Sequence, residues 1–208
     1  MYHQRLLSSP KCLQYLRERK ISLAVARVLE VGYFDLSQNS GYYDRMVFPV
    51  RSLFGEFVTF QGRAMYDWEN SKTWDGQPDR KYYHGSGSWK PLNLHGLNYN
   101  AELIIKMGFV VIVEGPFDVA ALLEAGIPAA AVLGARLSEF HCWLLRQLTD
   151  TVYIWLDGDA AGQKGAAYAK QLLTPWGINV KFLGTRLKDP AETLVSKGRE
   201  YLRGVVLA

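Results

Sequence analysis

The chain has 208 residues, of which 49% are hydrophobic and 13% aromatic, so it can bury a sizeable core and does not have the composition of a disordered protein. Its net charge of +4 arises in residues 1–100, which carry 13 Lys and Arg against 9 Asp and Glu, whereas residues 101–208 carry 11 of each. A basic half attracts phosphate backbones, although a charge of this size is as common in proteins that bind no nucleic acid. The longest apolar run, Met107 to Val113, is too short to cross a membrane.

The two cysteines, Cys12 and Cys142, stand far apart in the sequence. Because they form no CxxC pair, the sequence predicts no cysteine-based zinc site. The chain also shows no secretory signal peptide, and we therefore expect it in a reducing cytoplasm.

The first half mixes helical and strand patterns. Ser9 and Pro10 suit the start of a helix, and apolar spacing predicts helical structure over residues 9–30. Residues 45–65 are rich in β-forming side chains on either side of Gly55, which predicts a hairpin. Residues 66–100 carry many Gly, Trp, Tyr, Asn and Lys residues and predict a long loop region, which in compact domains is usually functional.

From residue 101 the pattern alternates strictly between strand and helix. The predicted strands are Val110–Val113, Ala129–Leu133, Val152–Leu156 and Val180–Leu183, and the predicted helices are Phe117–Glu124, Ser138–Leu148 and Ala161–Leu173. Continuous apolar strands between amphipathic helices predict a mainly parallel sheet covered on both faces. We expect one domain over residues 1–100 and a second over residues 101–208.

Acidic residues follow three of these strands. They are Glu114 with Asp118, then Asp157 and Asp159, then Asp189 with Glu192. Each group alone has an ordinary explanation: a turn, a solvated loop or the start of a helix. Three groups in order, each after an apolar strand, instead favour a site, because the carboxyl ends of parallel strands meet at one edge of a sheet.

A cluster of carboxylates of this kind would bind a hard cation. Carboxylates held close together repel one another unless a cation neutralises them. Oxygen ligands without His or Cys favour Mg²⁺ or Mn²⁺, and one or two such ions can orient a triphosphate and activate a hydroxyl group. A calcium EF-hand fits poorly, because the Asp157 segment lacks the later oxygen ligands and the closing Glu of that loop.

These motifs resemble the TOPRIM domain that DnaG-type primases share with topoisomerases and some nucleases. The segments that carry the resemblance are Val113-Glu114-Gly115-Pro116-Phe117-Asp118, Leu133-Gly134-Ala135, Leu156-Asp157-Gly158-Asp159-Ala160-Ala161-Gly162 and Asp189-Pro190. The longer form, with Asp118 and with Ala-Gly at 161–162, is similar to the bacterial primase branch in particular. The resemblance implies a TOPRIM-type α/β fold, with a mainly parallel sheet and helices on both faces, preceded by a smaller mixed α+β basic subdomain.

The first half also resembles the primase family. The matching segments are Tyr15–Arg19, Val31–Tyr33, Arg45–Arg51, Phe60–Arg63, Lys81–Tyr83, Lys90 and Gly96-Leu97. The resemblance implies that Arg45, Arg63, Lys81 and Lys90 line a basic groove that binds nucleotide phosphates and template DNA, with His84 as a further polar contact. The aromatic residues among them, Trp68, Trp74, Tyr82, Tyr83 and Trp89, could stack on bases or anchor the loops.

Several features depart from the family pattern. Ala191 replaces the second Asp of the third acidic motif, so one metal ligand is missing or Glu192 substitutes for it. Pro116 and Arg136 replace residues of other types. The zinc-binding and helicase-binding domains that flank the core in the family are absent from these 208 residues, which would fit a phage-encoded or minimal primase, or an excised core.

The sequence therefore predicts a primase that joins ribonucleotides into RNA primers on single-stranded DNA. In this hypothesis Glu114, Asp157 and Asp159 are catalytic, and they bind two or more Mg²⁺ or Mn²⁺ ions together with Asp118 and Asp189. The expected partners are the DNA template and ribonucleoside triphosphates, with a replicative helicase and a separate zinc-binding domain as further candidates. The alternatives are a TOPRIM-type nuclease and a non-catalytic nucleic-acid-binding relative.

Overall fold

The computed structural model describes residues 2–35, 43–72, 78–85, 93–134, 136–157, 160–183 and 189–208. Its helices are α1 (Tyr2–Leu7), α2 (Pro10–Glu18), α3 (Leu23–Val28), α4 (Leu97–Met107), α5 (Pro116–Glu124), α6 (Glu139–Arg146), α7 (Ala160–Leu173), the short 3-10 helix η2 (Thr174–Trp176), α8 (Pro190–Lys197) and α9 (Arg199–Leu207). Its strands are β1 (Gly32–Phe34), β2 (Arg45–Arg51), β3 (Phe57–Ala64), β4 (Tyr82–His84), β5 (Val110–Val113), β6 (Ala129–Ala131), β7 (Thr151–Ile154) and β8 (Asn179–Phe182).

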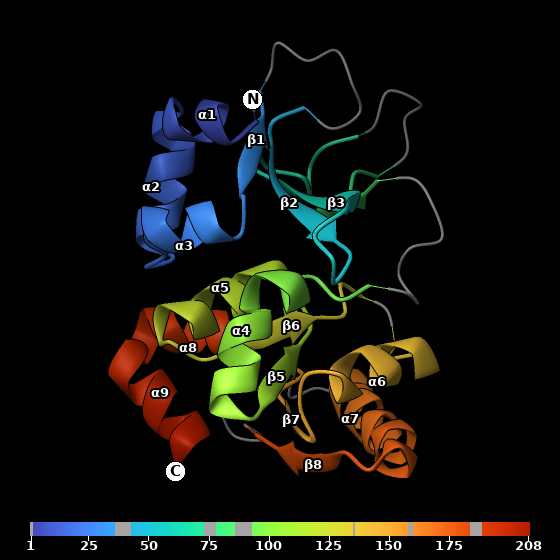
Figure 1. The fold of residues 1–208 in the computed structure, drawn as a ribbon. Coiled ribbons are helices and arrows are strands. Elements are labelled where there is room, and N and C mark those ends of the chain that lie inside the picture. Colours follow the sequence, from blue (N-terminus) through green and yellow to red (C-terminus); the bar gives the residue numbers. More distant parts are fainter. Residues whose placement is uncertain are drawn as a thin grey trace.

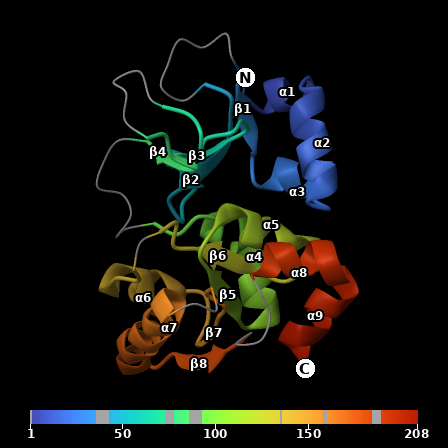
Figure 2. The same ribbon diagram turned by 180° about the vertical axis from the view of Figure 1, so that it is seen from behind.

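Among the described residues the strands form two four-stranded sheets (Figures 1 and 2). The first is antiparallel in the order β1-β2-β3-β4, and the second is parallel in the order β6-β5-β7-β8. This arrangement confirms the predicted fold class, a parallel sheet with helices on both faces preceded by a smaller mixed half. No helix of the described segments is both long and apolar enough to cross a membrane.

The predicted hairpin is the long antiparallel pair of β2 and β3. Its register runs from Arg45 opposite Ala64 to Arg51 opposite Phe57, with one irregularity between Val50 and Arg51. The connection contains Gly55 with a φ of +87°, a left-handed conformation that a side chain would disfavour.

The parallel sheet is buried on both faces, which explains its continuous apolar strands. On β5, Val111 and Val113 pack into one hydrophobic cluster with α5, α8 and α9. Val110 and Ile112 point to the opposite face and pack into a second cluster with α4, α6 and α7. Figures 1 and 2 show α8 and α9 to one side of the sheet and α6 and α7 to the other.

The first hydrophobic cluster continues into the N-terminal half. Phe48 of β2 packs edge-on against Phe117 of α5, with ring centroids 5.0 Å apart. The Ser22 backbone N–H, which precedes α3, donates to Glu124 at the end of α5 over 2.6 Å. The two sheets therefore share part of one core, and a domain boundary near residue 100 stays a prediction.

Some elements differ from the prediction. Residues 9–30 form two helices, because Lys20 adopts a φ of +55° and Ser22 caps a new helix by accepting from the Val25 N–H. Helix α4 begins within residues 66–100, which the sequence predicted as loop, and continues through residues 101–107, for which the sequence predicted no element. Its signals were present: buried Leu97 and Ile104 lie seven positions apart, and a glycine follows its last residue.

Candidate metal centre and adjoining basic face

The carboxyl ends of β5 and β7 bring two predicted site residues together. These strands are parallel neighbours, with Ile112 opposite Ile154. Glu114 directly follows β5, and its Oε1 accepts a 3.1 Å hydrogen bond from the backbone N–H of Asp157, which lies three residues after β7. The two loops therefore meet at one edge of the sheet, which we call the acidic edge.

A glycine in the first turn of α7 lets that helix press against the Asp157 loop. A Cβ atom added at Gly162 would lie 1.9 Å from the backbone oxygen of Asp157, so a larger residue would force one of the two segments to move. This contact fixes the backbone that carries the Asp157 carboxylate. Asp159, the partner in the predicted pair, lies outside the described residues.

Asp118 joins two of the acidic loops from inside the protein. Its side chain occupies the third position of α5 and accepts the Gly115 N–H over 3.1 Å and the Ala191 N–H over 3.2 Å, with one oxygen for each. Asp118 is 8% exposed. Both carboxylate oxygens therefore hold backbone amides, one in the loop after β5 and one at the start of α8.

Asp189 caps helix α8. Its side chain accepts the Glu192 N–H over 2.6 Å, and Pro190 occupies the first position of the helix. The N-terminus of α8 is tied to that of α5 through Asp118. The positive ends of two helix dipoles therefore face the acidic edge and favour negative charge there.

The electrostatics of the acidic edge fit a divalent cation. Burial, together with the negative charges of Asp189 and Asp157, raises the pKa of Asp118 to about 7, although the hydrogen bonds from the Ala191 and Gly115 amides oppose the rise. The described residues include no group of three Asp, Glu, His or Cys side chains placed to hold an ion, and Asp159 is not among them. The donors that do converge are carboxylate oxygens, which suit Mg²⁺ or Mn²⁺ and not zinc.

A basic face adjoins the acidic edge. Arg63 of β3 donates to the Tyr15 hydroxyl through Nη2 over 3.1 Å and through Nε over 3.3 Å. Two cations lie near the Tyr82 ring. The Arg63 guanidinium is 5.4 Å and the Lys81 ammonium 5.9 Å from the centroid of that ring. Burial raises the pKa of Tyr82 to about 12, with Arg63 opposing the rise and Asp118 adding to it, which places this cluster within electrostatic reach of the acidic edge.

Arg19 belongs to the same face, although the sequence gave no reason to select it. Its guanidinium lies 5.2 Å from the ring centroids of both Tyr15 and Phe117. Phe117 belongs to the loop-to-helix segment that also carries Glu114. The motif Tyr15–Arg19 matched the family, but only the fold shows that its last residue reaches α5.

Arg45 differs from the other predicted basic residues. It is 0% exposed, and its guanidinium pairs with Asp79 at 2.9 Å and donates to the Arg80 carbonyl over 2.9 Å. The Tyr83 ring packs against it at 4.4 Å. Arg45 therefore supports the segment 78–85 from inside and, in this structure, does not line an open groove.

A hollow of about 590 Å³ lies between α2 and the end of β3. Its lining combines cationic and aromatic side chains: Lys11, Tyr15, Arg63, Tyr66 and Trp68. Trp68 is thus placed where a base could stack, which keeps that prediction open. Tyr82 and Tyr83 instead contact Arg63 and Arg45.

The remaining predicted residues of the basic groove are only partly described. His84 lies on β4, opposite Gln61 of β3, and is half-buried. Lys90, Trp74 and Trp89 lie outside the described residues. Their predicted roles stay predictions.

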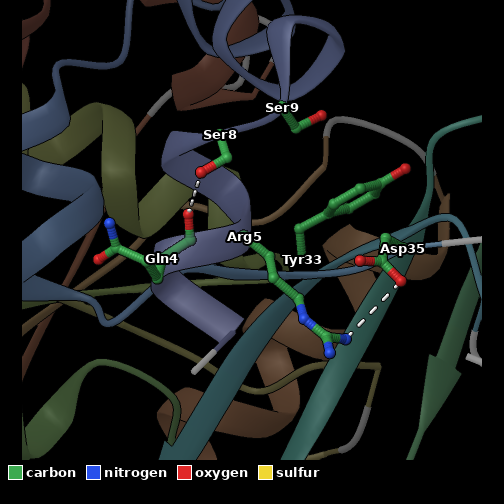
Figure 3. Close-up of a pocket in the computed structure, with 6 residues that line it drawn as sticks. All are labelled: Gln4, Arg5, Ser8, Ser9, Tyr33 and Asp35. Carbon is green, nitrogen blue, oxygen red and sulfur yellow. Dashed lines mark hydrogen bonds and ion pairs between the residues drawn. The ribbon is translucent and has the colours of Figure 1, made fainter. Parts of the chain in front are cut away.

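A second hollow of about 590 Å³ lies between α1 and β1 (Figure 3). Its lining residues are Gln4, Arg5, Ser8, Ser9, Tyr33 and Asp35. Arg5 pairs with Asp35 at 3.7 Å, and the Tyr33 hydroxyl donates to Asp44 over 2.7 Å. Because its charged groups are satisfied by one another, we assign this hollow no ligand.

Comparison with known proteins shows which proteins the chain is similar to. Residues 108–192 match the Toprim domain. The DNA primase of Aquifex aeolicus (strain VF5) is 30% identical over 237 residues, which cover 99% of this chain and 46% of that primase. The crystal structure of the Aquifex aeolicus primase with its zinc-binding and RNA polymerase domains superimposes with a TM-score of 0.83 at 28% identity, covering 99% of this chain and 57% of that one. The chain is homologous to the DnaG-type primase core.

The DnaG-type likeness extends over both halves of the molecule. A structure of the DnaG primase catalytic domain bound to ssDNA shares the fold, with a TM-score of 0.81 at 23% identity over 99% of this chain and 74% of that one. The Toprim match contains all of the predicted metal-site acids, from Glu114 to Asp189. The chain spans about half the length of the Aquifex aeolicus primase, and that relative gives no support to a phage origin.

Proposed function

We propose that this chain is the catalytic core of a DNA primase, which joins ribonucleoside triphosphates into short RNA primers on a single-stranded DNA template. The proposal rests on one observation: a hydrogen bond joins the Glu114 and Asp157 loops, and the basic face lies beside them. The alternatives of a nuclease or a non-catalytic relative have no comparable support, since the chain matches primases over nearly its whole length.

In this proposal the acidic edge binds two or more Mg²⁺ or Mn²⁺ ions. Glu114, Asp157, Asp159 and Asp189 provide the carboxylate ligands, and Asp118 holds the loops that carry them. Bound divalent ions would neutralise the triphosphate and activate the attacking 3′-hydroxyl. The residues of this chain keep the carboxylates converged, through the Asp157 N–H on Glu114 and the amides of Gly115 and Ala191 on Asp118.

The basic face binds the phosphates of the nucleotide and of the template. Arg63, Lys81 and the newly located Arg19 are held by aromatic rings, so their charged groups are pre-positioned next to the acidic edge. We include Lys90 and His84 in this set on the family resemblance alone. Arg45 acts indirectly, because it fixes the segment that carries Lys81.

The remaining partners are also proposals. We infer that residues 1–100 form the basic subdomain and residues 101–208 the metal-binding domain, joined by the shared core. A zinc-binding domain and a replicative helicase would complete the function, because a relative of known structure contains a zinc-binding domain beside its RNA polymerase domain.

The direct test is primer synthesis with labelled ribonucleotides on single-stranded DNA, with and without Mg²⁺. We expect metal-dependent incorporation that the double variant Asp157→Ala/Asp159→Ala abolishes. Asp150→Ala is a matched control, because this exposed aspartate precedes β7 at the opposite end of the strand. Full activity in the double variant would overturn the metal assignment, and metal-dependent DNA cleavage without nucleotides would favour a nuclease.

A further inference from the structure

Helices α6 and α7 present an exposed surface on the side of the parallel sheet opposite α8 and α9 (Figures 1 and 2). We define the α6–α7 surface by Arg136, which precedes α6, by Phe140 and Trp143 of α6, and by Lys164 and Tyr168 of α7. The proposed polymerase chemistry uses none of these side chains. Their combination is unusual for a solvated helix face, because three are large aromatic residues.

The aromatic members are accessible and grouped. Phe140 and Trp143 lie three positions apart on α6, with ring centroids 5.3 Å apart and an angle of 32° between the rings. They are 42% and 39% exposed, and Tyr168 on the neighbouring helix is 37% exposed. Helices α6 and α7 are in contact, and Arg136, four positions before Phe140, lies beside the Tyr168 ring, so the aromatic pair on α6 and Tyr168 are on neighbouring helices linked by one cation.

The cationic members lie near these rings. The Arg136 guanidinium lies 5.7 Å from the Tyr168 ring centroid, and among the described residues it has no hydrogen-bonded or ion-paired partner. Lys164 lies one helical turn before Tyr168. Residues 136–146 and 160–173 together carry four Lys and Arg against one carboxylate, Glu139, so positive charge gathers here in a half whose overall charge is zero.

The α6–α7 surface is continuous with the acidic edge. The Leu133 N–H, in the loop that leads to Arg136 and α6, donates to the Glu114 carbonyl over 3.0 Å. Helix α7 begins three residues after Asp157, and its Gly162 touches the Asp157 backbone. A chain bound at the acidic edge would therefore lie next to the loop before α6 and the first turn of α7.

We propose that the α6–α7 surface binds a single-stranded segment of nucleic acid, the part of the DNA template next to the polymerising site. The inference rests on the proposed function for the identity of the strand. Flat exposed rings stack on unpaired bases, which a duplex does not offer, and the neighbouring cations suit phosphates.

Fluorescence anisotropy with an oligo(dT) of about 20 nucleotides tests the proposal. It is measured in EDTA without nucleotides, so the result does not depend on whether the chain makes primers. We expect Phe140→Ala/Trp143→Ala to weaken binding by about 10-fold or more, since each stacked base contributes strongly to affinity. Arg136→Ala should also reduce the slope of log affinity against log salt by about 0.7, the loss of one phosphate contact.

Three further measurements keep the result interpretable. Tyr201→Ala is the matched control, because Tyr201 is 45% exposed on α9 across the sheet, and it should bind like the parent. Phe140→Leu/Trp143→Leu keeps apolar side chains at both positions and removes the rings, so it should show the same weakening even if the alanine pair is unstable. Photocrosslinking with bromouracil-substituted DNA should label Phe140, Trp143 or Tyr168.

The proposal is overturned if the parent chain does not bind oligo(dT). It is also overturned if the leucine pair binds it as tightly as the parent does, and the exposed rings would then be left for a protein partner. Loss of primer synthesis by Asp157→Ala/Asp159→Ala with intact oligo(dT) binding would instead bear only on the proposed polymerase chemistry.

Discussion

Asp118 supports the acidic edge from inside the protein and Arg45 supports the basic face, and these two buried charges are satisfied in different ways. Asp118 is 8% exposed and accepts two backbone N–H groups, and within the described part of the chain no cationic side chain forms an ion pair with it. Arg45 is 0% exposed and forms an ion pair with Asp79. Both residues position the segments that carry the ligand-facing side chains.

This difference separates positioning residues from ligand-facing ones. Glu114, Asp157, Arg63 and Lys81 keep part of their surface exposed, whereas Asp118 and Arg45 direct theirs inward. A buried ion pair is costly to break from one side, because the remaining charge stays buried. A buried carboxylate that only backbone amides hold is instead destabilised when it ionises. Loss of the Arg45 side chain should therefore destabilise the fold, whereas Asp118 itself should destabilise the fold as the pH rises.

The largest expected effect is on stability, from Arg45→Ala. This change leaves the Asp79 carboxylate buried without its partner and should lower the free energy of unfolding by about 3–5 kcal/mol. Urea denaturation measures the loss. The exposed pair of Arg199 and Glu200 supplies the control, because Arg199→Ala should change stability by less than about 1 kcal/mol. Equal, small effects for both would show that Arg45 does not hold the segment 78–85.

Asp118 should make the metal-free chain less stable as pH rises. Its folded pKa of about 7 lies above the unfolded value near 3.8, so its favourable contribution is fully present below pH 4 and is lost between pH 4 and pH 7. The loss is on the order of 4 kcal/mol, since the pKa rises by roughly three units and each unit corresponds to about 1.4 kcal/mol. Urea denaturation of the parent and of Asp118→Asn over this pH range measures it.

The informative quantity is the difference between these two chains as a function of pH. Asp118→Asn loses one amide contact at every pH, but it should lack the decline that the carboxyl group causes. Mg²⁺ should reduce the decline in the parent, because a cation offsets the charges of Asp157 and Asp189 that help to raise this pKa. Parallel curves for both chains would contradict the assignment.

Glu114→Gln tests the ligand-facing side of the acidic edge. The amide oxygen can still accept the Asp157 N–H, so the loop geometry and the melting temperature should be nearly unchanged. Removal of the negative charge should lower primer synthesis by about 100-fold, or about 2.7 kcal/mol in the barrier. Glu102→Gln, at an exposed position on α4, is the matched control. Activity near that of the parent would exclude Glu114 from metal binding.

The sequence predicted the parallel half well, because its signals are local. Each of β5 to β8 was predicted from an apolar segment of four or five residues, and the acids that follow β5 and β7 did meet at one edge. The role of Asp118 was not predictable in the same way. Its second partner is the backbone N–H of Ala191, 73 residues later, and a backbone donor leaves no trace in the sequence.

The basic half was predicted less well for the same reason. Arg45 and Arg63 both match family segments, but Arg45 is buried because Tyr66 and Asp79 reach it from 21 and 34 residues away. Arg19 was overlooked because its contact with Phe117 depends on how α2 packs against α5. Motifs thus identified the charged residues, whereas long-range packing decided which of them face a ligand.

Arg63→Ala gives the smallest expected effect and completes the contrast with Arg45. Arg63 is partly exposed and supported by Tyr15 and Tyr82, so its loss should remove a phosphate contact while the fold stays intact. The KM for ribonucleotides should rise by about 10-fold, or about 1.4 kcal/mol, with kcat changed by less than about threefold. Steady-state primer synthesis separates the two constants. If kcat fell instead and KM stayed constant, the interaction of Arg63 with the substrate would form only in the transition state. Arg63 would then belong to the reacting groups at the acidic edge and not to a phosphate-binding face.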